Sequence, residues 1–94
     1  MTSTPITLKF KPGRVANTYE CDITAQQSRL CVAASFERYG QLNAFLLDSN
    51  VPKPVSLGFD KGQTPSLWLN VISGMQLRIV ADSQPEAVTL ITED

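Results

Sequence analysis

The stretch that decides the fold is Ser66–Ala81, SLWLNVISGMQLRIVA, in which apolar residues recur at every second position on both sides of Ser73-Gly74. The recurring positions are Leu67, Leu69 and Val71 before the break, and Leu77, Ile79 and Ala81 after it. Alternation with a period of two is typical of a β-strand that turns one face to a core. The stretch therefore predicts two strands, each with one buried face.

The short break between these runs predicts that the two strands pair as a hairpin. Gly74 supplies the positive φ that a tight turn requires. Both apolar sets share one core face only if Leu69 lies opposite Ile79, with the neighbouring pairs Val71–Leu77 and Leu67–Ala81. We expect this hairpin to be the centre of the fold.

Similar runs occupy most of the remaining chain and are separated by turn residues. The predicted strands cover about residues 5–11, 18–24, 29–39, 42–48, 55–59, 66–72, 76–81 and 87–92. Val55, Leu57 and Phe59 are expected to face the core. About eight short strands predict an all-β fold, a single antiparallel β-sandwich or a jelly-roll-like barrel. The 94 residues predict one domain spanning residues 1–94, with residues 1–4 as a mobile N-terminal lead.

Residues 25–39 fit two interpretations. A Thr24-x-x-Gln27 capping box and a terminal Gly40 are typical of a helix. Alternation of Leu30, Val32, Ala34 and Phe36 favours a strand. Because every neighbouring segment predicts a strand, we prefer the strand.

The two cysteines, Cys21 and Cys31, are spaced neither as a redox pair nor as zinc ligands. Aligning the apolar faces of their strands puts Cys21 in the core and Cys31 on the opposite side. We therefore expect free thiols, as in a reducing compartment, although the spacing leaves a disulfide open.

Composition disfavours several classes of function. The net charge is −1 and histidine is absent, which disfavours nucleic-acid binding and catalysis by a neutral-pH base. No apolar stretch is long enough to cross a membrane, and the N-terminus lacks the pattern of a signal peptide. We therefore expect synthesis in a cytoplasm.

The acidic residues do not form a recognisable catalytic or metal-binding pattern. Glu20 and Asp22 are expected on a solvated strand face, opposite Lys9 and Lys11. Others lie in turn sequences, such as Asp60-Lys-Gly, where side-chain bonds to the backbone account for them. The sequence therefore predicts a protein that is not an enzyme and that has no cofactor and no metal site.

The outer face of the expected hairpin is unusually apolar. Trp68, Ile72 and Val80 share this face, and Phe45 and Leu47 add apolar surface on a strand that is apolar on both sides. One interpretation is that a second sheet or the Pro52–Pro54 link covers Trp68. The other is a subunit interface, which tryptophan and β-branched residues typically occupy. We favour the interface.

The strand-and-turn plan from Ile6 to Thr92, preceded by a lead that could act as an arm, resembles the small β-sandwich coat, decoration and spike-base proteins of bacteriophage particles. The resemblance implies a non-catalytic structural protein that forms a homo-oligomer and contacts another structural protein in a virion, and it assigns no functional residue. Two alternatives stay open: a ligand-binding module for glycan or peptide, and a small barrel that binds nucleic acid.

Overall fold

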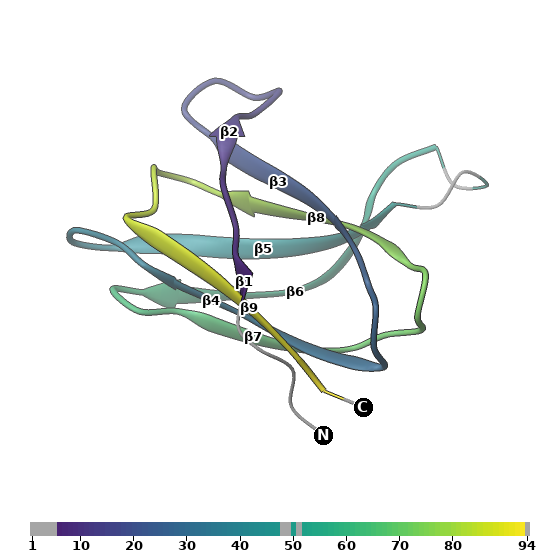
Figure 1. The fold of residues 1–94 in the computed structure, drawn as a ribbon. Helices are drawn as coiled ribbons and strands as arrows, with labels where there is room; N and C mark the ends of the chain where they lie inside the picture. Colours follow the sequence, from purple (N-terminus) through teal and green to yellow (C-terminus); the bar gives the residue numbers. More distant parts are fainter. Residues whose placement is uncertain (1–5, 48–49, 51, 94) are drawn as a thin grey trace.

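The computed structural model describes residues 6–47, 50 and 52–93 (Figure 1), and the expected lead at residues 1–4 lies outside them. The described residues form β-strands and connecting loops, which confirms the all-β prediction. The strands are β1 (Ile6–Thr7), β2 (Lys11–Pro12), β3 (Tyr19–Thr24), β4 (Arg29–Ser35), β5 (Gly40–Leu47), β6 (Val55–Gly62), β7 (Ser66–Asn70), β8 (Gln76–Ala81) and β9 (Ala87–Glu93).

The strands form two antiparallel sheets. The four-stranded sheet has the order β1-β9-β4-β7, and the five-stranded sheet has the order β2-β3-β8-β5-β6. With the short β2 set aside, the pairs are nested: β1 with β9, β3 with β8, β4 with β7, and β5 with β6. The pairs β4–β9 and β5–β8 join them into sheets. The two sheets form the expected β-sandwich, and the nested order of their strands is that of a jelly roll.

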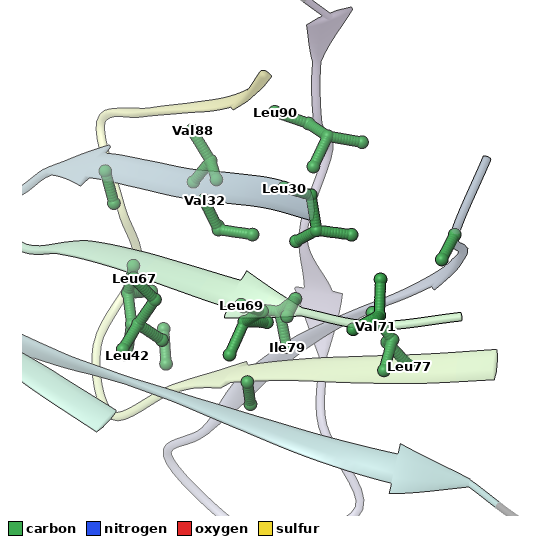
Figure 2. Close-up of a cluster of buried hydrophobic side chains, with 14 of the residues drawn as sticks. Leu30, Val32, Leu42, Leu67, Leu69, Val71, Leu77, Ile79, Val88 and Leu90 are labelled. Carbon is green, nitrogen blue, oxygen red and sulfur yellow. The ribbon is translucent and has the colours of Figure 1, made fainter. Parts of the chain in front are cut away.

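The core lies between the two sheets (Figure 2). Leu30, Val32, Leu67 and Leu69 extend from the four-stranded sheet toward Leu42, Leu77 and Ile79 of the five-stranded sheet. The buried apolar residues form one cluster, which Leu8, Phe10 and Met75 extend at its margin. The facing of every apolar residue in the deciding stretch is therefore as predicted.

The hairpin prediction is wrong. β7 pairs with β4, whereas β8 pairs with β3 and β5 in the other sheet. Leu69 and Ile79 both reach the core, but from opposite sides. Alternation fixes which face of a strand is buried, and it carries no information about the partner strand.

The loop after β7 crosses from one sheet to the other, and a second crossing loop holds it in place. Gly74 has a φ of 98°, as a turn there requires. Its N–H donates to the carbonyl of Ala25 at 2.7 Å, and the Ala25 N–H donates to the carbonyl of Met75 at 2.8 Å. The β3–β4 and β7–β8 connections are therefore bonded to each other.

The ambiguous segment contains a strand, β4, which confirms the preferred interpretation. Cys21 and Cys31 are not joined in a disulfide, as expected, and lie on strands of different sheets. Their burial reverses the expectation: Cys21 is half-buried at the margin of the five-stranded sheet, whereas Cys31 is buried. Cys31 does lie on the outward face, where its register neighbours Trp68 and Ile91 flank it.

The expectation that β6 buries its apolar residues is also wrong. Val55, Leu57 and Phe59 are exposed. β6 is the edge strand of its sheet, and its register with β5 shifts between Ala44 and Phe45. Such a bulge changes the direction of the side chains beyond it. Phe59 lies opposite Asn43 and so shares the outward face of the sheet.

Candidate functional site

Exposed apolar side chains concentrate along one side of the sandwich. Among the described residues, seven large hydrophobic side chains are exposed, and five of them lie on β6, on β7 or in the loop that follows β7. We call this surface the β6–β7 edge and define it as Val55, Leu57, Phe59, Trp68 and Ile72. Single exposed apolar residues are ordinary, but a concentration on one side marks a contact surface.

The backbone along this side is also open to pairing. Within the described residues, β6 pairs only with β5 and β7 only with β4, so each strand is an edge of its sheet. The two edges run next to each other (Figure 1), and the Ser66 N–H donates to Asp60 Oδ2 at 2.9 Å between them. Monomeric proteins usually protect such edges with charges or prolines. From Val55 to Phe59, β6 has neither.

Trp68 and Phe59 flank the edge on its two sides. Trp68 lies opposite Cys31 on the outward face of the four-stranded sheet and is 48% exposed. The guanidinium carbon of Arg29 lies 4.4 Å from the centroid of its ring, which is a cation–π contact. Phe59 is 60% exposed on the outward face of the other sheet.

The five predicted interface residues do not share one surface. Trp68 lies on the four-stranded sheet and Ile72 in the loop after it, whereas Phe45, Leu47 and Val80 lie on the outward face of the five-stranded sheet. Because the expected hairpin does not form, Trp68 and Val80 lie on opposite sides of the sandwich.

A second feature, which we call the outer hollow, lies on the outward face of the five-stranded sheet. Its volume is about 490 Å³. Phe45 and Val80 lie in it, on adjacent strands β5 and β8. It is lined by Arg14, Val15, Thr18, Glu20, Phe45, Lys53, Pro54, Arg78 and Val80. Two of the predicted interface residues, Phe45 and Val80, therefore line this hollow.

Ionic contacts hold the charged side chains in and beside the hollow. Arg78 donates from Nε and Nη2 to the two carboxylate oxygens of Asp22, at 2.8 Å and 3.1 Å. Glu20 Oε1 lies 3.7 Å from Arg78 Nε and 3.8 Å from Arg14 Nε. The hydrogen bond from Arg78 lowers the pKa of the Asp22 carboxyl below its ordinary value, and burial opposes this effect only in part.

The expectation that Glu20 lies on a solvated face is wrong, because Glu20 is only 8% exposed. Its carboxylate lies beneath the loop between β2 and β3, where the Arg14 N–H approaches Oε2 at 3.4 Å. The alternation of β3 predicts the outward direction of Glu20 correctly, but no signal in the sequence shows that this loop folds back over it.

The described residues hold no group of three or more histidine, cysteine, aspartate or glutamate side chains that could bind a metal ion. No described helix is long and apolar enough to span a membrane. Comparison of the chain with protein-family models, with curated proteins and with solved structures finds no match in any of the three.

Proposed function

We propose that this protein is a non-catalytic structural protein that assembles with copies of itself through the β6–β7 edge. The observation that carries the proposal is the concentration of Val55, Leu57, Phe59, Trp68 and Ile72 along two unpaired strand edges. An apolar surface gains free energy when a partner removes it from water. An open edge gains hydrogen bonds when a strand is added to it.

A second copy of the chain is the occupant that this surface fits best. β6 is itself an edge strand whose first half, Val55 to Phe59, is uncharged and carries three large apolar residues, so two copies of β6 can pair antiparallel about a two-fold axis and continue the five-stranded sheet. Closed two-fold contacts of this kind are the commonest in homo-oligomers. A domain of this size without a disulfide also gains stability from such a contact.

We further propose that the assembled protein is a component of a phage particle, such as a decoration or spike-base protein, where it contacts another structural protein. The jelly roll supports this proposal by analogy, because capsid domains use this architecture. Lectins and other binding proteins use it as well, so the fold supports the proposal less strongly than the edge supports self-association.

The test is the mass of the purified protein in solution, measured by light scattering behind a sizing column over a range of concentrations. We expect a mass that is a multiple of the 10.3 kDa chain. Phe59→Lys should reduce the mass to that of one chain, because it places a charge at the edge. Trp68→Glu should do the same and leave the monomer folded.

Tyr39→Lys is the matched control, because Tyr39 is a similarly exposed aromatic, at 59%, that lies in the loop between β4 and β5 and not on β6 or β7. Its mass should equal that of the unsubstituted protein. A monomer at every concentration would contradict the proposal, as would an oligomer that Phe59→Lys leaves intact. Unfolding of Trp68→Glu would show that Trp68 stabilises the fold of the single chain.

A further inference from the structure

The outer hollow combines an apolar base with a cationic rim. Phe45 and Val80 form the base, and Val15 and Pro54 add apolar surface at its margins. Binding sites for small molecules typically have a volume of about 300–1,000 Å³ and a mostly apolar lining with a few fixed polar groups. The hollow, at about 490 Å³, has these properties. It is separate from the β6–β7 edge, because none of the five edge residues lines it.

Arg78 brings a fixed donor to the hollow. Its hydrogen bonds to Asp22 use Nε and Nη2, so Nη1 has no acceptor among the described residues. Every fully buried side-chain nitrogen or oxygen of the described residues has a hydrogen-bond partner. Because Nη1 has none, it is not fully buried, and solvent reaches it. Because Arg78 is only 8% exposed and lines the hollow, this access is from the hollow.

The charges around the hollow favour an anion. Arg14, Lys53 and Arg78 contribute three positive charges, and Glu20 and Asp22 contribute two negative ones, which leaves one positive charge. Both carboxylates are already engaged by arginine. Lys53 has no ion-pair partner among the described residues. A ligand with one negative charge therefore complements the site.

The wall of the hollow is formed in advance by the loop between β2 and β3. Gly13 donates to the Thr18 carbonyl at 2.8 Å, and Thr18 donates to the Val15 carbonyl from both its N–H, at 3.2 Å, and its hydroxyl, at 2.6 Å. A wall held by its own hydrogen bonds needs little ordering when a ligand binds. The backbone of Arg14 and Val15 is thus positioned before binding.

We propose that the outer hollow binds a small organic carboxylate with an apolar body. The body lies on Phe45 and Val80, while the carboxylate accepts a hydrogen bond from Arg78 Nη1 and forms an ion pair with Lys53. A neutral amide of the same shape would keep a weaker hydrogen bond to its carbonyl oxygen but lose the ion pair, and it would therefore bind more weakly.

The test is a titration of the ¹⁵N-labelled full chain with 4-phenylbutyrate, followed by amide chemical shifts, with the neutral 4-phenylbutyramide in parallel. We expect saturable shifts near the hollow with a Kd below about 1 mM, and weaker binding of the amide. The Trp68 indole signal, on the other sheet, should not move. Absence of saturable shifts up to about 10 mM, or equal binding of the two compounds, would overturn the proposal.

Variants then locate the site. Lys53→Gln should weaken binding of 4-phenylbutyrate roughly threefold to fivefold, which is the usual scale for one exposed ion pair. Lys61→Gln, an exposed lysine on β6 that does not line the hollow, should leave the Kd unchanged. Equal effects of the two variants would show that the anion binds by net charge alone and would overturn the proposal. Repeating the titration with Phe59→Lys separates ligand binding from assembly.

Discussion

Arg78 of β8 and Asp22 of β3 lie directly opposite each other, and the guanidinium binds both carboxylate oxygens of its partner. The same register continues from Arg78 to Phe45 on β5. The ion pair thus lies beside the aromatic residue of the outer hollow. The ion pair connects β3, at the charged margin of the five-stranded sheet, to β8, next to the apolar centre of the same sheet.

Loss of this ion pair should destabilise the protein. In Asp22→Asn, a neutral amide oxygen replaces the two carboxylate oxygens, and among the described residues the buried guanidinium keeps only Glu20, at 3.7 Å, as an anionic partner. Hydrogen bonds between charged groups contribute about 1.5–3 kcal/mol. The Asp22 side chain is 46% exposed, which weakens the interaction through solvent screening. We expect the free energy of unfolding, measured with urea, to fall by about 1–2 kcal/mol.

Glu37→Gln provides the control for that measurement. Glu37 is exposed and its carboxylate makes no ion pair with the described residues. Its free energy of unfolding should match that of the unsubstituted protein. A loss in Asp22→Asn no larger than the loss in Glu37→Gln would mean that the ion pair contributes nothing to stability.

The same pair makes stability depend on pH in the acid range. The hydrogen bond from Arg78 holds the pKa of Asp22 below the ordinary value of 3.8, and the positive charges of Lys11 and Arg14 lower it further. Since the folded pKa lies below the unfolded one, the stabilisation is complete above the ordinary pKa and is lost as the pH falls through the folded pKa.

We therefore expect the free energy of unfolding to decrease as the pH is lowered from about 5 to below 3.8, with the loss continuing until Asp22 is protonated in the folded protein. Urea unfolding at a series of pH values measures this. The decrease should be smaller in Asp22→Asn. Equal slopes in the two proteins would exclude Asp22 as the source.

Gly40 is needed because Phe36 packs against it. A Cβ at Gly40 would lie 2.5 Å from three ring carbons of Phe36, whose side chain is fully buried. Gly40→Ala should lower the free energy of unfolding by about 1–3 kcal/mol, the usual range for overpacking. Combining it with Phe36→Leu should cost less than the sum of the two single variants. Strict additivity would contradict the proposed clash.

The two thiols should differ in reactivity. Burial raises the pKa of the Cys21 thiol, and the negative charge of Asp22 raises it further, so little thiolate is present at neutral pH. Cys31 is protected by burial. With Ellman's reagent and mass analysis, we expect slow labelling of Cys21 and labelling of Cys31 only on unfolding. Labelling of both at the same rate in the folded protein would contradict this.

Alternation in the sequence predicted the core well because it reports the facing of each strand. Leu67, Leu69, Leu77 and Ile79 all reach the core as expected. The partner strands were not predictable, because in a jelly roll consecutive strands often belong to opposite sheets. Because β7 and β8 do not pair as the predicted hairpin, Trp68 and Val80 do not share the surface that was predicted for them.

The candidate sites were harder to predict than the core because they depend on what covers a face. Phe59 has the sequence pattern of a core residue, yet it is exposed, and no described strand or loop lies over it. Glu20 has the pattern of a surface residue, yet a loop encloses it. Contacts between segments distant in sequence decide both outcomes, and alternation within one strand does not report them.

The nested order of the strands also constrains how the chain folds. Ile6 pairs with Leu90, and β4 needs β9 for its second neighbour, so the four-stranded sheet remains incomplete until the last strand arrives. Structures dominated by pairings between distant segments fold slowly, in about milliseconds to seconds. During synthesis, β4 lacks its hydrogen-bonded neighbour β9, and the core lacks Val88 and Leu90, until residues 87–93 leave the ribosome. The pairing of β9 with β1 and β4 is thus the step that closes the four-stranded sheet of the nascent chain.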